Sequence, residues 1–361
     1  MAILSQGVDF TLSIEMSAQT KMNWSEQVVL VTGGTGSFGS KFVEIMLDEY
    51  RPKKLIVFSR DELKQHEMRA AGLDHPSLQY LLGDVRDAQR LERAFSDVTV
   101  VVHAAALKQV SACENNPFEA VQTNIVGSKN VIDAAIDHGI RRVIALSTDK
   151  AVHPISLYGA TKLCAEKMFV QANAQAGAQQ MRFSCVRSGN FLGSRSSVIP
   201  IFAEQRKRGM ITITDPRMTR FWITLDSVAR FVIRRLEQMI GGEIFVPKMP
   251  SMKLLDLAQA VAPNCQIDCT GIRPGEKLHE VLLSDDEARN SVETEEMFVI
   301  QPAQVWRRKE NWHDGIAVAE GFRYASDTNS EWLTADDIYK LAEGTAPQLS
   351  GLSNGTENRI Q

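Results

Sequence analysis

The segment "VLVTGGTGSFGSKFVE" (residues 29–44) runs from an apolar stretch through three spaced glycines into a helical pattern. Gly33, Gly36 and Gly39 follow a predicted strand and open a predicted helix, the context that a dinucleotide-binding loop requires. Glycines let the backbone turn tightly and approach a pyrophosphate, and the helix N-terminus supplies N–H donors. The segment therefore predicts a dinucleotide site, whereas a glycine-rich turn without a ligand would not need this placement.

The residues around this loop alternate between strand and helix patterns. Short runs rich in Val, Ile and Leu occupy residues 27–32, 54–59, 78–83, 98–104 and 142–147. Near-continuous apolar runs are typical of strands that are buried on both faces of a parallel sheet. Phe42, Ile45 and Met46 show helical spacing, and Gly139 is placed to end a helix. This alternation predicts an α/β fold with a doubly wound parallel Rossmann sheet.

The pattern loosens after about residue 190, where helix-like and strand-like pieces mix with loops. We expect four regions: an N-terminal extension at 1–25, a dinucleotide-binding Rossmann domain at 26–190, a smaller and partly interleaved α/β substrate domain at 191–344, and a disordered tail at 345–361. The tail is polar and has no periodicity, which is the composition of a segment that does not fold alone.

Composition excludes several classes of function. The 361 residues carry a formal net charge of −4, so no polyanion-binding surface is indicated and nucleic acid is not an expected partner. The five scattered cysteines do not form a disulfide or zinc pattern, and no metal site is expected. No stretch reaches the roughly 20 apolar residues of a membrane span, and the N-terminus makes a poor signal peptide. We therefore expect a cytoplasmic protein without a membrane partner.

The residues after the second predicted strand bear on the choice of dinucleotide. A carboxylate for the ribose hydroxyls is expected about 20 residues beyond the loop, but Ser59 and Arg60 stand there, with Lys64 one turn on. A hydroxyl and two cations suit a 2′-phosphate, so the sequence favours NADP over NAD. Asp61 keeps NAD open, and an ordinary solvated helix start would also explain the two cations.

The segment "ALSTDKAVHPISLYGATK" (residues 145–162) carries two sets of proton-handling groups. Tyr158 and Lys162 form a Tyr-x-x-x-Lys pair, and Asp149 and Lys150 precede them. One set is enough for an alcohol dehydrogenase. The Asp149–Lys150 pair could be a surface ion pair, and a Tyr–Lys pair occurs by chance on many helices, but both together beside a dinucleotide loop point to catalysis.

Together these motifs resemble the extended short-chain dehydrogenase/reductase superfamily, and more specifically the inverting UDP-N-acetylglucosamine 4,6-dehydratases. The resemblance covers residues from about 26 to about 300 and rests on "SRDELKQ", "HAAALKQV", "NPFEAVQTNIVGSKNVIDAA", "ALSTDKAVHPISLYGATK", "GSRSSVIPIF", "DPRMTRFWIT" and "GIRPGEKLHE". Two positions depart from the family pattern, because Ser188 replaces a tyrosine and Ser196 replaces a glycine. Both flank the expected sugar pocket and bear on substrate preference.

The resemblance implies a reaction that uses both sets of groups. Tyr158, with its phenolate stabilised by Lys162, would take the proton of the 4-hydroxyl as C4 is oxidised. Lys150 would then remove the C5 proton, and Asp149, with Thr148 beside it, would protonate the hydroxyl that leaves C6. Hydride return to C6 would give UDP-2-acetamido-2,6-dideoxy-β-L-arabino-hex-4-ulose, which begins pseudaminic acid synthesis. A base at C5 requires the pKa of Lys150 to lie below about 10.4, the value of a free lysine.

The resemblance also implies the binding residues. The dinucleotide site would consist of Gly33, Thr35, Gly36, Ser37, Phe38, Gly39, Ser59, Arg60, Lys64, Asp84, Val85, Ala104, Ala105, Lys108, Tyr158 and Lys162. The UDP-sugar site would consist of Lys108, Asn190, Arg220, Lys253, Arg273 and Glu276. Arg273 with Pro274 and Gly275 could instead be only a turn, and Asp84 only a cap. A homo-oligomer, either a dimer or a hexamer, is also implied.

Three other functions stay open from the sequence. A retaining dehydratase would use the same fold but carries a glutamate where this chain has Lys150. A nucleotide-sugar 4-epimerase needs only the C4 redox step. A catalytically silent NADP-binding regulator would not need the intact set of Asp149, Lys150, Tyr158 and Lys162.

Overall fold

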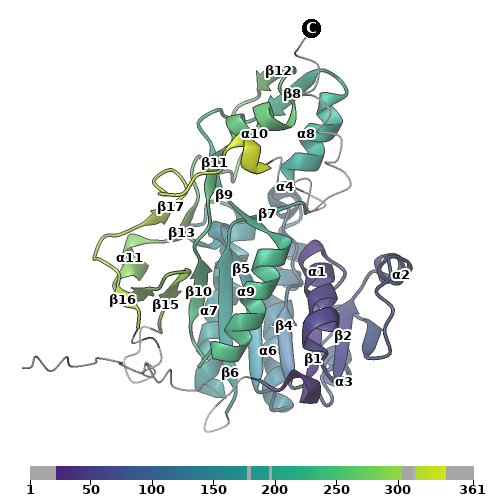
Figure 1. Cartoon of the computed structure of the whole chain (residues 1–361). Helices are drawn as coiled ribbons and strands as arrows, with labels where there is room; N and C mark the ends of the chain where they lie inside the picture. Colours follow the sequence, from purple (N-terminus) through teal and green to yellow (C-terminus); the bar gives the residue numbers. More distant parts are fainter. Residues whose placement is uncertain (1–21, 177–179, 195–196, 303–311, 313, 339–361) are drawn as a thin grey trace, which may run out of the picture.

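The computed structural model describes residues 22–176, 180–194, 197–302, 312 and 314–338 (Figure 1). Residues 1–21 of the expected N-terminal extension, the expected tail at 345–361 and Ser196 lie outside these residues. The end of the extension belongs to the main core, because Trp24 is buried and its indole donates to Glu237 at 2.8 Å. None of the described helices is long and apolar enough to cross a membrane.

A ten-stranded sheet runs through the lower part of the molecule, with strand order β16-β14-β15-β10-β6-β5-β4-β1-β2-β3 among the described residues (Figure 1). Seven neighbouring strands, from β3 to β10 in this order, are parallel, and the last three pair antiparallel. The parallel strands are β1 (Val28–Thr32), β2 (Lys54–Ser59), β3 (Leu78–Leu82), β4 (Val100–His103), β5 (Arg142–Thr148), β6 (Arg182–Ser188) and β10 (Ile244–Pro247). The antiparallel strands are β14 (Ser291–Glu293), β15 (Met297–Ile300) and β16 (Ile316–Ala317).

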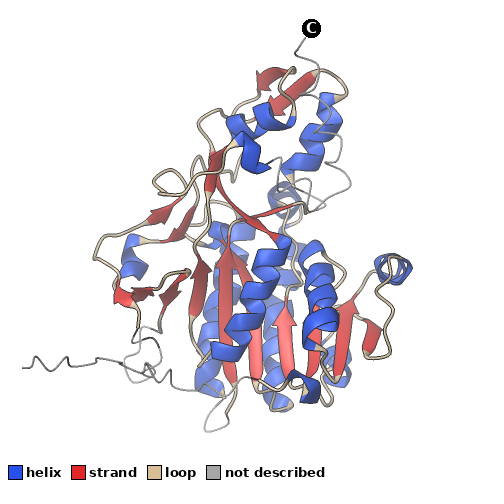
Figure 2. Cartoon of the chain, in the orientation of Figure 1, coloured by secondary structure: helices blue, strands red, loops and turns tan. Residues whose placement is uncertain are grey.

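Helices cover both faces of this sheet (Figure 2). Among them, α1 and α9 contact each other, and α6 packs against both α3 and α7. The helices of this part are α1 (Ser37–Ile45), α2 (Glu62–Ala70), α3 (Ala88–Ala94), α4 (Val110–Asn115), α5 (Pro117–Val121), α6 (Gly127–Asp137), α7 (Leu157–Gln175), α9 (Leu225–Gln238) and α11 (Asp285–Ala288). The short helices are η1 (Trp24–Glu26), η2 (Met46–Tyr50), η3 (Gln122–Val126) and η4 (Asp149–Ala151).

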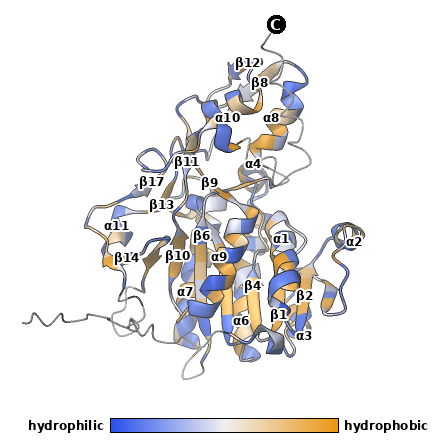
Figure 3. Ribbon diagram, in the orientation of Figure 1, coloured by the Kyte–Doolittle hydropathy of each residue, from blue (hydrophilic) through white to orange (hydrophobic). Residues whose placement is uncertain are grey.

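The predicted strands and the predicted fold class are confirmed. Each of the five strands predicted in the first half begins and ends within two residues of an observed strand. Every residue of β1 is buried, as expected where helices lie on both faces, and Figure 3 shows hydrophobic colours along the central strands. The predicted helical face is also present, since Phe42, Ile45 and Met46 are all buried. Gly139 follows α6 with φ of 63°, a conformation that suits glycine.

A smaller lobe stands above the carboxyl ends of the parallel strands (Figure 1). It contains two small sheets, ordered β11-β9-β7 and β12-β8, and has a separate apolar core that includes Phe202, Trp222 and Leu257. Its elements are β7 (Asn190–Leu192), α8 (Val198–Arg206), β8 (Met210–Ile213), β9 (Thr219–Thr224), β11 (Ser251–Lys253), α10 (Leu254–Val261) and β12 (Gln266–Cys269). A further pair, β13 (Val281–Leu283) and β17 (Tyr324–Ala325), lies beside it.

The chain passes between the two parts more than once. After β9, helix α9 and strand β10 return to the large sheet, and β14, β15 and β16 extend that sheet later in the chain. The expected boundary at residue 190 therefore marks the first exit from the large sheet, not the end of that sheet. The residues expected to form a partly interleaved substrate domain are shared between the lobe and the sheet.

A buried ion-pair cluster ties together three elements of the large-sheet part. Arg187 on β6 is fully buried and contacts Glu166 of α7 at 2.5 Å and Glu287 of α11 at 2.8 Å. Glu287 also completes the capping box of α11 with Ser284. Because removing one partner from a buried cluster leaves an unpaired charge, this cluster fixes α7 against β6.

Candidate active site

The glycine loop lies at the carboxyl end of β1. Gly33 has φ of 65°, and a Cβ built there would lie 2.8 Å from the backbone of Ala105. A Cβ on Gly39 would lie 2.5 Å from the backbone of Gly34, so α1 packs closely on the loop only because this residue is glycine. Gly36 is the N-cap of α1 and has no side chain that could occupy the helix N-terminus. These features fit the backbone cradle of a pyrophosphate.

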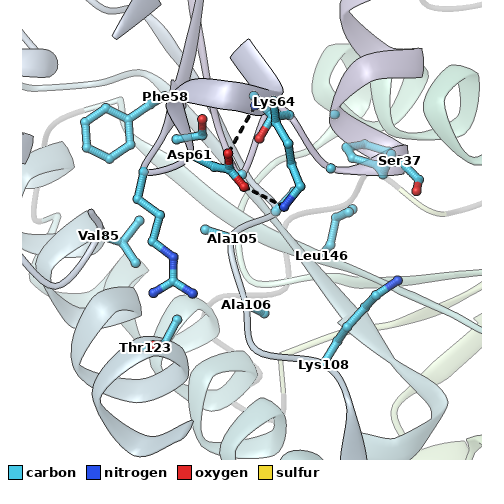
Figure 4. Close-up of a pocket in the computed structure, with 18 of the residues that line it drawn as sticks. Ser37, Phe58, Asp61, Lys64, Val85, Ala105, Ala106, Lys108, Thr123 and Leu146 are labelled. Atoms are coloured by element: carbon cyan, nitrogen blue, oxygen red, sulfur yellow. Dashed lines mark hydrogen bonds and ion pairs between the residues drawn. The ribbon is translucent and has the colours of Figure 1, made fainter. Parts of the chain in front are cut away.

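A cavity of about 440 Å³ opens over this loop (Figure 4). Phe38, Phe58 and Val85 supply apolar walls, and Ala104 and Ala105 leave space because their side chains are small. Of the residues assigned to the dinucleotide site from the sequence, fourteen line this cavity: Gly33, Thr35, Gly36, Ser37, Phe38, Gly39, Ser59, Arg60, Lys64, Asp84, Val85, Ala104, Ala105 and Lys108. Sequence reasoning missed six other lining residues, of which Ala106, Thr123 and Leu146 lie within segments that carry the resemblance, whereas Phe58, Gly83 and Phe191 do not.

The two cations expected at the ribose are paired with carboxylates. The ammonium group of Lys64 lies 2.6 Å from Asp61 Oδ2, as Figure 4 shows, and Arg60 lies 3.5 Å from Asp84. Asp61 also caps α2 by accepting from the backbone N–H of Lys64. The guanidinium group of Arg86 and the backbone of that residue hold the pKa of Asp84 below its usual value, although partial burial opposes them.

A second cavity, of about 320 Å³, adjoins the first and extends beneath the lobe. The two share five lining residues: Ala104, Ala106, Lys108, Leu146 and Phe191. Thr148, Lys150, Tyr158 and Lys162 line the second cavity, whereas Asp149 is fully buried and does not line it, so the second proton-handling set reaches this space through Lys150. Its remaining lining residues include Ser147, Ser188, Asn190, Ser194, Ser197 and Trp222. Ser188, one of the two departures from the family pattern, therefore stands in the wall of this cavity.

Thr148, Asp149 and Lys150 occupy the end of β5 and the short helix η4. The carboxylate oxygen Oδ1 of Asp149 accepts from the Thr148 hydroxyl at 2.8 Å and from the Lys150 ammonium at 3.0 Å. Asp149 is fully buried, and among the described residues its Oδ2 has no hydrogen bond. Lys150 also reaches the amide oxygen of Asn190 at 3.4 Å, which brings the lobe strand β7 against the catalytic turn.

The expectation for the pKa of Lys150 is wrong. Burial disfavours the ammonium form, but the negative charges of Asp149 and Glu280 outweigh burial and raise the pKa above its ordinary value. The sequence showed the adjacent aspartate but gave no sign that a second carboxylate, Glu280, lies 3.4 Å away. In the absence of substrate, Lys150 is therefore an ammonium ion at neutral pH.

Tyr158 and Lys162 lie on one face of α7, whose first turn is capped by Ser156. Burial raises the pKa of Tyr158 to about 12, while the Lys150 charge opposes this rise. Lys162 donates to the carbonyl oxygen of Leu146 at 2.7 Å, and burial lowers the pKa of Lys162. In this structure the main cation acting on the Tyr158 hydroxyl is thus Lys150, whereas the sequence assigned that role to Lys162.

Four residues expected at the sugar site do not line either cavity: Arg220, Lys253, Arg273 and Glu276. Arg220 is buried and donates to the carbonyl oxygens of Thr219, Leu278 and Lys277. Lys253 ends β11 with an exposed side chain. Arg273 and Glu276 form a turn in which the backbone N–H of each bonds to the other residue.

Several groups at the site carried no sequence signal. Glu280 ends the segment "GIRPGEKLHE", yet only the fold brings it to Lys150. Lys277 of the same segment donates to the carbonyl oxygens of Asp149 and Val152. In the second cavity, Ser147, Ser197 and Trp222 each have a buried polar atom without a hydrogen bond among the described residues. Such atoms are suited to a polar ligand, because leaving them unpaired is costly.

The chain is similar to characterised proteins over most of its length. Residues 29–302 match the family model described as polysaccharide biosynthesis protein. A Campylobacter jejuni protein named UDP-N-acetylglucosamine 4,6-dehydratase (inverting) is 46% identical over 331 residues, covering 89% of this chain and 99% of that protein. A Rickettsia canadensis protein named UDP-glucose 4-epimerase is 41% identical over 273 residues, covering 73% of this chain and 79% of that protein.

A solved structure agrees with these sequence matches. The X-ray structure of Pen from Bacillus thuringiensis superposes with a TM-score of 0.82 at 36% identity, covering 90% of this chain and 98% of that chain. The glycine loop and the pair of Tyr158 and Lys162 both lie within the region matched by the family model. The chain therefore belongs to the family of polysaccharide biosynthesis proteins.

Proposed function

We propose that this protein is a configuration-inverting 4,6-dehydratase acting on UDP-N-acetylglucosamine. The observation that carries this proposal is the position of the second acid/base set. Lys150, held by Asp149, lines the same cavity as Tyr158, and that cavity continues into the space over the glycine loop. The name of the Campylobacter jejuni relative, at 46% identity, supports the same substrate and outcome.

The first step requires a base at the sugar 4-hydroxyl. Tyr158 takes this proton, and the positive charge of Lys150 favours its phenolate form. Lys162, held by the Leu146 carbonyl, lines the wall between Tyr158 and the dinucleotide cavity. A bound nicotinamide dinucleotide supplies the hydride acceptor at C4 and the hydride donor at C6.

The second step removes water. Oxidation at C4 acidifies the hydrogen at C5, which Lys150 removes, and the hydroxyl on C6 departs with a proton from the Asp149 end of the pair. Lys150 and Asp149 are already joined by a 3.0 Å hydrogen bond. The proton taken from C5 and the proton given to the C6 hydroxyl can therefore pass through the same hydrogen-bonded pair. A proton from solvent then joins C5 on the face opposite the one that lost its proton, so the product has the L-arabino configuration there.

A nucleotide-sugar 4-epimerase is the second candidate, because the Rickettsia relative carries that name at 41% identity. An epimerase needs the C4 redox pair but has no use for a second acid and base. Incubating the purified protein with UDP-N-acetylglucosamine and no added cofactor separates the two. Loss of one water with an inverted C5, by mass spectrometry and NMR, supports the dehydratase, whereas a C4 epimer of unchanged mass supports the epimerase.

For the dinucleotide, we propose NADP. Arg60 and Lys64 line the cavity where a ribose 2′-phosphate would lie, and a phosphate would compete with Asp61 and Asp84 for these cations. Guanidinium and ammonium groups both bind phosphate well, whereas Asp61 alone would suit the ribose hydroxyls of NAD.

The protein is expected to purify with NADP(H) bound, because the cofactor is regenerated within each cycle. Denaturing the protein and identifying the released nucleotide tests this. Arg60→Asp should weaken NADP binding by roughly tenfold or more through loss of a charge-assisted contact. Arg93→Asp, an exposed change at the end of α3, is the matched control. Release of NAD alone, or equal NADP affinity in both variants, would contradict the assignment.

Arg273→Ala is expected to raise the Michaelis constant for the UDP-sugar much more than it lowers turnover. As a diphosphate contact remote from the reacting carbons, Arg273 would contribute uniform binding. Losing one charge-assisted contact costs about 1.5–3 kcal/mol, roughly tenfold to a hundredfold in affinity. Steady-state kinetics with Arg289→Ala as the control measure this. An unchanged Michaelis constant would leave Arg273 as only the turn residue that its backbone bonds describe.

A further inference from the structure

Glu280 is a buried carboxylate that the fold brings to the catalytic turn from the C-terminal part of the chain. It immediately precedes β13, and its backbone is fixed there by bonds to Ser326, with the Glu280 N–H donating at 2.9 Å and its carbonyl accepting at 2.8 Å. The residue is 1% exposed, and its Oε1 lies 3.4 Å from Lys150 Nζ. Lys150 therefore stands between two carboxylates, Asp149 on its own turn and Glu280 across from it.

Besides Lys150, two further cations lie within 4 Å of the Glu280 carboxylate. Oε1 lies 3.8 Å from Arg220 Nε, and Oε2 lies 3.7 Å from Lys277 Nζ. Both of these cations also donate to carbonyl oxygens, Arg220 to three and Lys277 to two. Oε2 has no hydrogen bond within the part of the chain that the structure describes. A buried carboxylate with an unbonded oxygen is costly, and such groups call for a functional explanation.

The proposed reaction requires a group that can take a proton from Lys150. Lys150 must be an uncharged amine when it removes the C5 proton, but it is an ammonium ion while Asp149 and Glu280 are both ionised. Asp149 is the less suitable acceptor, because its Oδ1 is already occupied by hydrogen bonds from Thr148 and Lys150 and because the elimination uses Asp149 as the route to the C6 hydroxyl. The other ionisable groups facing this cluster are Tyr158, which must itself accept a proton, and the cations Lys277 and Arg220.

We propose that Glu280 accepts the ammonium proton of Lys150 in the sugar-filled cavity once C4 has been oxidised, and so releases the neutral amine that acts at C5. This inference rests on the proposed dehydratase function. A bound sugar covers Lys150, whose side chain is 24% exposed here, and displaces the water that stabilises separated charges. When water is excluded, a neutral amine beside a neutral carboxylic acid becomes more stable relative to the ion pair, because desolvation penalises both charges.

The protons balance over the elimination. An N–H bond of Lys150 breaks and an O–H bond forms on Glu280. The C5–H bond then breaks as the amine takes that proton, its electron pair forms the C5=C6 double bond, and the C6–O bond breaks. The departing hydroxyl takes one proton from Lys150 through Asp149, and Glu280 returns its proton to Lys150. The cluster ends with one ammonium and two carboxylates, as it began.

Glu280→Gln tests this role because it keeps the shape of the side chain but cannot accept the proton. At neutral pH, water loss should fall by about a hundredfold, within the range for removing a proton-transfer group. Oxidation at C4 should continue, so absorbance of the reduced dinucleotide should accumulate. The rate of water loss in the variant should rise with pH in proportion to hydroxide, because solvent then deprotonates Lys150. Glu280→Asp should recover part of the rate, and it guards against loss of folding in the glutamine variant.

The matched control is Glu243→Gln, which alters a carboxylate of the same 1% exposure that bonds to Ser184 and two backbone N–H groups away from both cavities. This control should lower the melting temperature without separating oxidation from water loss. Glu280 has no proton role if Glu280→Gln removes water at the wild-type rate, or if it slows both steps equally at every pH. A wild-type protein that removes no water at all would instead show that the proposed dehydratase function fails.

Discussion

Lys150→Ala should stop water loss from C6 while oxidation at C4 still occurs. The expected fall in dehydration is about a thousandfold, because the variant lacks the only base assigned to C5. The 4-keto intermediate then accumulates, so absorbance of the reduced dinucleotide should rise in the near ultraviolet and persist. Mass spectrometry of the quenched mixture should find no dehydrated sugar.

The same change should also alter the first step. Lys150 lowers the pKa of Tyr158, which burial has raised to about 12, so its removal should raise that pKa further. The phenolate then forms only at higher pH, and the pH profile for C4 oxidation should move upward. A structural defect would not produce a slower oxidation that recovers as pH rises.

Two further variants sharpen this experiment. Lys248→Ala removes another lysine of an ion pair, 2.7 Å from Glu293 on the large sheet, and should leave both steps unchanged. Lys150→Glu should at best restore elimination with retention at C5. In heavy water the wild-type protein should place deuterium at C5. If Lys150→Ala dehydrates the sugar at a near wild-type rate with inversion, another group is the base.

Tyr158→Phe should abolish the first step, and with it everything that follows. Without the phenolic oxygen the 4-hydroxyl keeps its proton, and the expected loss is about a thousandfold to ten-thousandfold in turnover. Neither reduced dinucleotide nor dehydrated sugar should accumulate, which distinguishes this variant from Lys150→Ala. Dinucleotide content after purification should be unchanged, because the glycine loop and its cavity stay intact.

Tyr80→Phe is the control for this variant. It also removes one tyrosine hydroxyl, which donates to the Leu73 carbonyl at 2.6 Å beside β3. Only a modest loss of stability, about 1 kcal/mol, should follow. If Tyr158→Phe instead accumulated reduced dinucleotide, the base for the 4-hydroxyl would have to be sought elsewhere in the cavity.

The sequence predicted the large sheet well because its strands are apolar on both faces. Residues 54–59 were predicted as a strand, and β2 spans the same residues. The glycine loop was predicted equally well, since a positive φ at Gly33 and the close contact at Gly39 tolerate few other residues. Features of this kind are indicated by residues that are close in sequence, so they could be predicted without knowing the fold.

Electrostatic interactions between residues distant in sequence could not be predicted in the same way. The pKa of Lys150 was predicted with the wrong sign because the charges of Asp149 and Glu280 together outweigh burial, and Glu280 is distant in sequence. Arg220 was expected at the sugar diphosphate, but its guanidinium group is bound by backbone carbonyls of residues that only the fold brings near. The sequence shows which side chains are charged, but it does not show which groups they contact, because those contacts depend on the fold.

The route of the chain through the upper lobe has a consequence for synthesis on the ribosome. The lobe is assembled from two excursions, one leaving after β6 and the other after β10, and the pairing of β9 with β11 joins them. As the nascent chain emerges, the nucleotide-binding half can begin to form once β6 is out, in keeping with N-terminal units folding first. The residues that line the second cavity all precede residue 223, but until residues 251–253 have formed β11 one edge of β9 lacks its neighbour and offers unpaired backbone groups to other chains. Premature termination between the two excursions would thus produce an aggregation-prone fragment that retains nucleotide affinity.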